Sequence, residues 1–508
     1  AAAISFEVSV SGMAPGALRV VTVEGEEALS RPYRFEIEAV SDDPNLAVDA
    51  LPGKPATLTM RRETDERQIH GVIAEVDENG MAAGGFYAYR LVLVPRLWLL
   101  TLSRHNRTFG TVTPMTVVEV VSAVLSERDG LQLGGEDYAF RLSDPGAYPA
   151  RPFWAQYNES DLDFISRLLE HWGIAYYFEQ GADEEKLVFV DSNIMMPRQQ
   201  IDGDLPYDSR AGAPLGGRGI AQSLRRRLRP VPKQARLKDY NYELPQLALE
   251  ASQPVADGTF GEYVEYAAHF RDTAEGNVLA RARAEELGSR RDVFELETDS
   301  LFVSAGQLFS LHDHFRSALN QDYLPTVVRH FGEQPLAGAY ANQGGARPGY
   351  HNEVSAIPAE TAYRPARRTP QAKVPQLMPA VVDAEEAMSE RAMLDPQGRY
   401  KVAVDFDMTQ NPVYKRSAYL RMAQPYAGPE AGLHFPLRKG TEVLLGWRDG
   451  DPDRPLILSA VPNPLTASPV TQLNHTENKI HTPSGIMLVM NDGPGNAGGG
   501  SGAPAEQA

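Results

Sequence analysis

The chain has 508 residues, no cysteine and a formal net charge of −18. This length predicts about two to four domains, and the lack of cysteine excludes disulfides, thiolate zinc sites and cysteine nucleophiles. The negative charge disfavours non-specific nucleic-acid binding. The sequence contains no run of about 18 apolar residues that could span a membrane. No secretory signal is visible in the N-terminal residues AAAISFEVSV.

The first 95 residues are predicted to form about five or six strands with short connections, because apolar and polar residues alternate along them. Gly25 and the step Ser30-Arg31-Pro32 predict turns, and Gly71 within a strand predicts a bulge or a bent corner. So many short strands favour a small barrel. The alternating stretches are Ile4–Thr59, Gln68–Val76 and Phe86–Val94.

Two of the three predicted helices are supported by their composition and spacing. Apolar residues recur at helical intervals in Thr113–Glu127, with Thr116 or Thr113 as the N-cap. The segment Ala274–Leu287 is rich in Ala, Arg and Glu, which favour helix. The first half of the chain is therefore predicted to be α+β.

The remaining helix has the clearest local signal. It is predicted to begin after the N-cap Ser160, where the charge of Asp161 is stabilised by the helix dipole, and to end at Gly173 in a left-handed cap. An aromatic strand, Ile174–Phe178, follows it and is expected to pair with Lys186–Val190.

The middle of the chain returns to strands. Ser223–Tyr240, Val293–Leu311 and Leu324–Phe331 have strand character. The arginines within Arg225–Arg229 are interpreted as partners for an acidic surface of a neighbouring copy, in preference to nucleic acid, because no aromatic residues interleave with them. Residues 335–374 are rich in Gly, Ala, Pro and Asn in their first part and are interpreted as an extended linker.

A small sheet is predicted near the C-terminal end. Thr441–Trp447 and Leu456–Val461 read as two strands of a hairpin. The turn Asp449–Asp453 joins them, because Gly permits positive φ, Pro fixes φ, and Asp side chains bond their own backbone. For that reason Asp451 and Asp453 are assigned to turn chemistry and not to a hydrolytic pair.

These residues, with others in the same order along the chain, make the sequence similar to VgrG proteins, the spike components of type VI secretion systems and related contractile injection machines. The matching stretches are Leu29–Phe35, Gly53-Lys54-Pro55, His70-Gly71-Val72, Tyr157, Glu159-Ser160-Asp161, Gly173-Ile174, Asp395–Arg399, Gln424-Pro425, Gly440 and Gly450-Asp451-Pro452-Asp453-Arg454-Pro455.

The resemblance implies a mainly β, α+β chain in five parts. The expected parts are a phage-hub-like region of two strand-rich, barrel-like lobes with helices at 1–334, the linker at 335–374, an OB-fold barrel at 375–464, the start of an intertwined trimeric β-prism at 465–492, and a flexible Gly/Ala-rich tail at 493–508. Relatives of this build usually carry a longer needle, so the short C-terminal end predicts an abridged needle or a truncated chain.

The segment expected to form the prism is too short to bury its own apolar residues. Ile486, Leu488 and Met490 share one face of a five-residue strand, and the other face is apolar as well. A two-stranded hairpin cannot cover both faces, so copies of the chain are expected to do so, and the resemblance implies three copies. The predicted trimer-interface residues are Ile480, Ile486, Leu488 and Met490.

The resemblance also implies a function. The expected protein is a structural homotrimer that caps an inner tube and punctures a target membrane. Its expected partners are itself, an Hcp-like tube protein, a PAAR-like tip protein, baseplate proteins and effectors, with transient membrane contact and no nucleic acid. It would assemble in the bacterial cytoplasm and be released on firing. The alternatives are the spike of an extracellular or phage-like particle and, in another class, a cell-wall-degrading tail enzyme, disfavoured because no lysozyme-like domain is visible.

No catalytic, cofactor-binding or metal site is predicted. His312 and His314 lie two residues apart but lack a marked third ligand, and are interpreted as loop or interface residues. His475 and His481 precede or border the C-terminal strands. In a trimer three copies could bring them together in a histidine ring, but they are interpreted as exposed residues. Nucleophile-elbow, phosphate-loop and Rossmann signatures are absent from the sequence.

Overall fold

The computed structural model describes residues 4–63, 65–81, 85–127, 130–209, 219–334, 349–374, 377–384, 390–409 and 416–493. The chain divides into two compact units. The first unit comprises residues 1–105, 114–151 and 158–372, and the second comprises residues 106–113, 152–157 and 373–508. The predicted fold class, mainly β with helices in a hub-like region and a small barrel, is confirmed.

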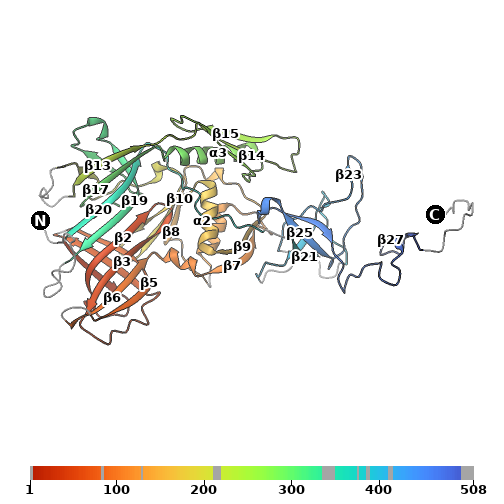
Figure 1. The fold of residues 1–508 in the computed structure, drawn as a ribbon, viewed down its shortest axis with the longest axis horizontal. Coiled ribbons are helices and arrows are strands. Elements are labelled where there is room, and N and C mark those ends of the chain that lie inside the picture. The colour runs from red at the N-terminus through yellow and green to blue at the C-terminus, as the bar shows by residue number, and fades with distance from the viewer. Residues whose placement is uncertain are drawn as a thin grey trace, which may run out of the picture. The chain divides into compact units, whose positions relative to one another are not determined.

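A twelve-stranded sheet dominates the first unit (Figure 1). Its hydrogen-bonded path runs β1-β4-β5-β6-β3-β2-β19-β20-β17-β13, with β18 paired to β19 and β12 to β18. The bounds are β1 Ile4–Val10, β2 Arg19–Ala28, β3 Arg31–Ser41, β4 Pro55–Arg62, β5 Asp65–Met81, β6 Tyr87–Val94, β12 Asp204–Pro206, β13 Ala221–Leu228, β17 Asp292–Thr298, β18 Phe309–His312, β19 Asp322–Glu333 and β20 Gly349–Pro358. The first six strands therefore continue into later ones through β2 and β19 and do not form a sheet of their own.

Two turns were predicted in the region of β2 and β3, and the structure confirms only one of them. Ser30 has a φ of 59° and lies in the two-residue turn that joins Ala28 to Arg31, as predicted. Gly25 instead lies inside β2, opposite Phe35. A Cβ atom at Gly25 would stand 2.1 Å from Cδ1 of Phe35. The glycine is needed because the phenyl ring lies across the strand, not because the chain turns there.

The segment predicted as a linker, 335–374, contains a strand in the interior of the large sheet. β20 pairs antiparallel with both β19 and β17. The prediction was wrong because the buried positions of β20 include Tyr350 and Asn352 before the apolar Val354 and Ala356. Buried polar residues hide the alternation by which a strand is recognised in a sequence.

Those polar residues belong to a buried chain of hydrogen bonds. Asn352 Nδ2 donates to Tyr350 Oη at 3.1 Å, and that oxygen lies 2.6 Å from Nδ1 of His330. His330 Nε2 lies 2.9 Å from Oε1 of Glu27, which also accepts from Arg67. A neutral His330 with its proton on Nε2 fits this arrangement, because its Nδ1 can then accept from the Tyr350 hydroxyl. Burial lowers the pKa of His330 accordingly.

Three α-helices accompany the sheets in the part of the chain that the structure describes. α1 spans Val117–Leu125 with a capping box at Thr116, and α2 spans Asp161–Trp172. α3 spans Thr273–Gly288 and packs on a three-stranded sheet of order β15-β14-β16, as Figure 1 shows for β14 and β15. Among the described residues, no helix combines the length and the apolar content needed to cross a membrane.

The smaller strands complete the fold. A second three-stranded sheet has the order β10-β11-β8 and contains the predicted pairing of the aromatic strand after α2. The stretches predicted as single strands at Ser223–Tyr240 and Val293–Leu311 are each two strands, β13 with β14 and β17 with β18. The remaining bounds in this part are β7 Arg104–Phe109, β8 Tyr138–Arg141, β9 Trp154–Ser160, β10 Ala175–Gln180, β11 Glu185–Val190, β14 Gln234–Asp239, β15 Leu249–Pro254 and β16 Glu262–Tyr266.

The second unit contains a four-stranded sheet of order β22-β21-β25-β26. Its buried side chains include Tyr400, Val443 and Ile457. The predicted C-terminal hairpin of the barrel is confirmed, since β25 pairs antiparallel with β26. The bounds are β21 Met378–Asp383, β22 Lys401–Val404, β23 Ala427–Gly428, β24 Ala431–Gly432, β25 Glu442–Trp447, β26 Pro455–Ala460, β27 Glu477–His481 and β28 Met487–Asn491.

Two short stretches from far upstream are built into this second unit. Thr108 Oγ1 donates to Oδ2 of the buried Asp407 at 2.6 Å. The backbone N–H of Ala155 donates to Oδ1 of Asp453 at 2.6 Å, and the ring of Tyr157 packs edge-on against Phe406. The unit is therefore assembled from three separate parts of the sequence, which the sequence analysis did not predict.

Candidate self-association site

The C-terminal strands β27 and β28 form an antiparallel hairpin, in which Ile480 lies opposite Leu488 and Asn478 opposite Met490. The turn is closed by hydrogen bonds from Gly485 N to Thr482 O and from Thr482 N to Ile486 O, both 2.9 Å long. Gly485 has a φ of 90°, which glycine adopts without strain.

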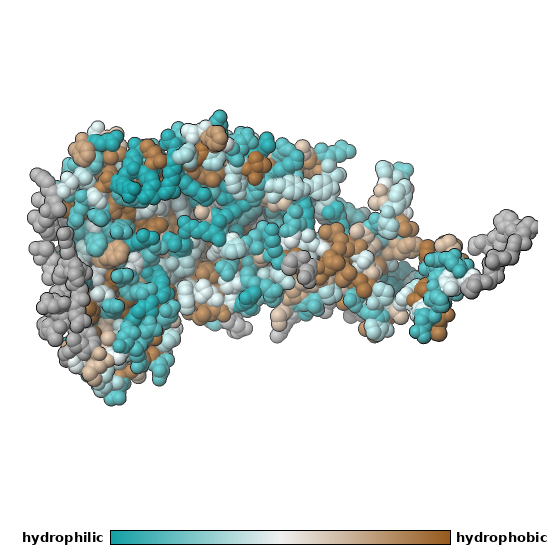
Figure 2. Space-filling model, in the orientation of Figure 1, coloured by the Kyte–Doolittle hydropathy of each residue, from teal (hydrophilic) through white to brown (hydrophobic). Residues whose placement is uncertain are grey.

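Every residue of β28 is exposed. Ile486, Leu488 and Met490 keep 71%, 55% and 57% of their surface accessible. Figure 2 shows such hydrophobic residues on the surface in the part of the chain that carries β27. A lone two-stranded hairpin is marginally stable in water, and contiguous exposed apolar residues mark interaction surfaces. The hairpin is thus the strongest candidate for a surface that another chain covers.

The two faces of this hairpin differ. Residues directly opposite each other share a face, so Ile480 and Leu488 lie together, with Ile486 and Met490 on the same side two residues away in each direction. The other face carries Met487 and Val489 beside the charged Lys479 and Glu477, whose side chains pair at 3.4 Å. The four predicted interface residues therefore share the more apolar face, and their role at an interface stays a prediction.

The stretch Gly450–Pro455 forms the turn between β25 and β26. Asp449 and Gly450 have φ values of 57° and 72°, and Arg448 N donates to Arg454 O at 3.1 Å. Oδ1 of the buried Asp451 accepts from Asp453 N at 3.0 Å. These hydrogen bonds show that Asp451 stabilises the turn, which also contains Pro452. Gly440 has a φ of 84° in the loop before β25.

The predicted ends of α2 are confirmed. Ser160 accepts a hydrogen bond from Asp163 N through its side chain, and Gly173 ends the helix with a φ of 71°. Asp161 is buried in the first turn, where the helix dipole stabilises its charge.

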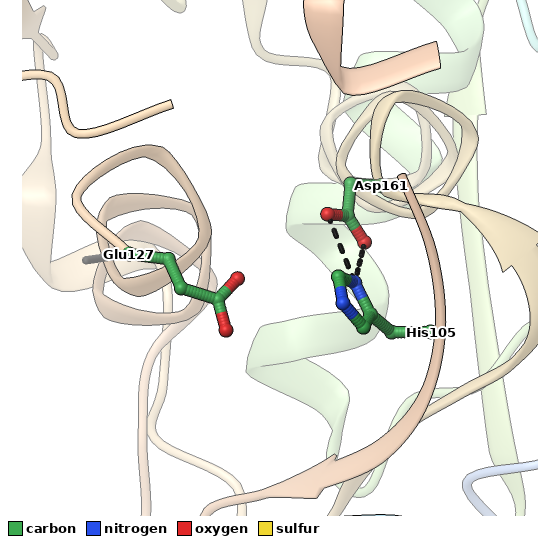
Figure 3. A group of neighbouring side chains, drawn as sticks. All are labelled: His105, Glu127 and Asp161. Atoms are coloured by element: carbon green, nitrogen blue, oxygen red, sulfur yellow. Dashed lines mark hydrogen bonds and ion pairs between the residues drawn. The ribbon is translucent and has the colours of Figure 1, made fainter. Parts of the chain in front are cut away.

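Asp161 also belongs to a group that the sequence analysis did not identify. His105, Glu127 and Asp161 each place one ligand atom within 4.8 Å of the others. Figure 3 shows the ring of His105 against the carboxylate of Asp161, with the carboxylate of Glu127 facing them from the end of α1. Nδ1 of His105 lies 2.9 and 3.1 Å from the two Asp161 oxygens. This hydrogen bond satisfies a buried carboxylate, so the group needs no metal to explain it.

The histidines singled out in the sequence do not converge. His312 Nδ1 lies 2.8 Å from Asp313 Oδ2. His314 is buried, its ring stacked on Phe315 at 4.2 Å, and its Nδ1 accepts from Arg316 N at 3.1 Å. The remaining two, His475 and His481, are exposed near the hairpin, and a ring of histidines from several copies stays untested there.

The arginines of β13 are paired within the chain. Arg226 contacts Asp292 at 2.6 Å, and Arg227 and Arg225 contact Glu295 at 2.7 and 3.5 Å. Both acidic residues lie on the adjacent strand β17. Pairing within the chain therefore accounts for Arg225, Arg226 and Arg227 without a neighbouring copy, and the expected contact with an acidic surface of such a copy stays a prediction. Cross-strand pairing within one sheet satisfies them first.

Comparison with known families gives two matches, one in the N-terminal part of the chain and one in the C-terminal part. The family described as phage tail baseplate hub (GPD) matches residues 26–336. The family described as type VI secretion system/phage-baseplate injector OB domain matches residues 390–461.

Individual relatives point the same way. The type VI secretion system spike protein VgrG4b of Pseudomonas aeruginosa is 31% identical over 90% of this chain and 56% of its own length. A solved structure, the E. coli c3393 protein, covers 90% of this chain and 99% of its own, with a TM-score of 0.64 and 25% identity. It is described as a type VI secretion component with structural similarity to the T4 bacteriophage tail proteins gp27 and gp5. A chain of the Francisella PdpA–VgrG complex covers 96% of this chain and 83% of its own, with a TM-score of 0.60 and 8% identity, which shows a shared fold.

Proposed function

Because the chain belongs to the VgrG family of type VI secretion spike proteins, we propose that it is a structural hub and spike subunit of a contractile injection machine. The observation that carries the proposal is the order of parts in one chain. A baseplate-hub region and an injector OB domain are followed by a hairpin whose apolar residues are exposed. The chain spans 56% of the VgrG4b relative, so the activity of a whole spike is proposed here and not read from the comparison.

The proposed assembly is a homotrimer. Two features of the hairpin support it. The strands β27 and β28 pair only with each other, which leaves a free hydrogen-bonding edge on each strand of this described segment. Their apolar face, with Ile480 and Leu488 at its centre, needs cover that the described residues of one chain do not supply. Three copies wrapped around a common axis would pair the free strand edges and cover the apolar face. The number of copies is inferred from the resemblance to the VgrG family.

The proposed mechanism is mechanical. Strands paired between copies leave no free sheet edges and make a stiff rod, and a stiff rod transmits the force of a contracting sheath to a small tip. No covalent step is required.

The proposed partners follow from the family. They are an Hcp-like tube protein, a PAAR-like tip protein, baseplate proteins and effectors, with assembly in the bacterial cytoplasm and release on firing. A VgrG protein of Francisella has been solved with PdpA, which supports partner binding as a property of such spikes. The proposed role is structural, as the name of the VgrG4b relative indicates. The cell-wall-degrading alternative gains no support from these relatives.

A second reading, the spike of an extracellular or phage-like particle, is favoured by one observation. The match over residues 26–336 is to a phage tail baseplate hub. A genetic neighbourhood with a membrane-anchoring complex would support the type VI reading, and one with tail fibres and a free baseplate would support the particle.

The mass of the protein in solution tests the proposal. Light scattering and native mass spectrometry of the full chain are expected to give three times the monomer mass of 55.8 kDa. A monomer at micromolar concentration would contradict the proposed assembly. Both methods report mass and not shape, so agreement between them separates a true trimer from an elongated monomer.

A further inference from the structure

Three arginine side chains gather in the first unit where α3 ends. Arg283 Nη1 contacts Glu286 Oε2 at 2.5 Å, and Arg290 contacts the other oxygen of the same carboxylate. Arg283 and Glu286 are buried, whereas the side chain of Arg290 is half-exposed. One carboxylate therefore serves two guanidinium groups.

The third arginine, Arg367, reaches the same place from the segment after β20. Its Nη1 contacts Glu265 Oε1 at 2.5 Å. The hydroxyl of Tyr263 donates to Glu265 Oε2 at 2.8 Å, and the guanidinium of Arg283 lies 5.6 Å from the centre of the Tyr263 ring. Arg283 and Arg367 thus meet around one tyrosine and its carboxylate partner.

The cluster has an excess of positive charge and unused donors. Three guanidinium groups share the carboxylates of Glu265 and Glu286. The Nε–H groups of Arg283 and Arg367 are buried and have no hydrogen-bond partner among the described residues. Buried donors are nearly always satisfied in folded proteins, and a bound water or ion commonly accounts for the exceptions. Arg283, at 5% exposure, is too deep for bulk solvent to supply that partner.

The ionisation of nearby groups reflects the same excess. Burial and the neighbouring Arg283 lower the pKa of Arg367. Burial, Arg283 and Arg368 lower the pKa of Arg290. The pKa of His171 is lowered by burial first and then by Arg367. The total charge of the chain is strongly negative, so this positive potential is local.

We propose that Arg283, Arg290 and Arg367 form a binding site for a multivalent oxyanion of the phosphate or sulfate class. Guanidinium groups match such anions well, because several N–H donors in a fixed plane can bind two oxygens at once. The anion would accept from the buried Nε–H groups of Arg283 and Arg367, and Arg290 would close the site from the solvent side. It would tie the end of α3 to the segment that carries Arg367.

The test is anion binding to the purified full chain, with inorganic phosphate as the probe. Isothermal titration is expected to show one saturable site, and phosphate is expected to raise the midpoint of thermal unfolding because it binds the folded state. Arg367→Gln removes the buried Nε–H donor of a side chain that is itself 25% exposed, and is expected to weaken phosphate binding by about tenfold or more. Arg283→Gln is expected to do the same.

The matched control is Arg281→Gln, an exposed arginine on the same helix that contacts only Glu285 among the described residues, at 3.9 Å. It should leave phosphate binding unchanged. If Arg283→Gln fails to fold, the partly exposed Arg367→Gln still decides the question. A phosphate effect equal to that of chloride at matched ionic strength would overturn the proposal. Equal weakening by Arg281→Gln and Arg367→Gln would also overturn it, because it would indicate general charge screening.

Discussion

Glu27 and His330 illustrate how single buried groups set the response of the protein to acid. Burial opposes the charge of Glu27, but Arg67 and the hydrogen bond from His330 outweigh it, so its pKa is lowered. Burial lowers the pKa of His330. In both cases the unfolded chain binds protons at a higher pH than the folded chain, so stability must fall as pH falls.

We therefore expect the midpoint of thermal unfolding to drop as pH decreases below about 6.5, where an unfolded histidine takes up its proton, and to drop further below about 4.3 through Glu27. Replacement His330→Gln should flatten the first part of this dependence. It should also lower the midpoint at neutral pH, because buried groups lose a hydrogen-bond partner. That loss costs about 1–3 kcal/mol of the free energy of unfolding. The exposed His351→Gln on β20 is the control. An unchanged pH profile in His330→Gln would contradict the assignment.

A second residue-scale prediction concerns Gly25. Gly25→Ala should lower the unfolding midpoint, because the added Cβ would stand 2.1 Å from Phe35 Cδ1, and overpacking a core costs about 1–3 kcal/mol. Gly135→Ala, where a Cβ meets nothing within 4 Å and φ is not positive, is the control. Equal midpoints for the two variants would mean that Phe35 moves aside freely.

At the scale of elements, the C-terminal hairpin makes the sharpest prediction. Leu488→Asp or Ile486→Asp should reduce the trimer population in light scattering, because a charge buried at an interface without a partner costs several kcal/mol. Removing the chain after Pro464 should do the same. Ser484→Asp adds the same charge at the exposed turn of the hairpin and should leave the mass unchanged. A full trimer in the Leu488→Asp and Ile486→Asp variants would assign assembly to other parts of the chain.

Elements with local signals could be predicted from the sequence. The ends of α2 follow from Ser160 and Gly173, and the hairpin of β25 and β26 follows from its turn residues. β20 could not be predicted, because its inward positions begin with Tyr350 and Asn352, whose side chains bond to His330 and to the Ser300 carbonyl from distant parts of the sequence. The arginines of β13 could not be assigned either, since the acidic residues that pair with them are more than 60 positions away.

At the scale of the whole molecule, the second unit depends on residues 106–113 and 152–157. A fragment that begins at Lys373 should unfold at a lower temperature than the second unit does in the full chain, because Asp407 loses Thr108 and Asp453 loses the Ala155 N–H. Circular dichroism of the fragment, compared with Thr108→Val in the full chain, measures this. Thr108→Val removes one of these bonds and should have an intermediate effect. A fragment as stable as the unit in the intact protein would show that the upstream segments are dispensable.

The composite second unit also explains why the domain boundaries could be only partly predicted. Its own hydrophobic pattern lies within the C-terminal third of the sequence, around Tyr400 and Val443. The two upstream stretches are too short to carry a periodic signal, and their contacts become visible only in three dimensions. The resemblance to a family gave the order of the parts, and the structure adds which stretches complete each of them.

The chain passes between its two units five times. Exchange of the second unit for that of a relative would require three stretches to be replaced together, residues 106–113, 152–157 and 373–508. A chimera joined at a single point would combine parts that do not match. Recombination between genes of this kind should therefore favour crossovers downstream of the barrel, where new cargo can be appended without disturbing what lies before it.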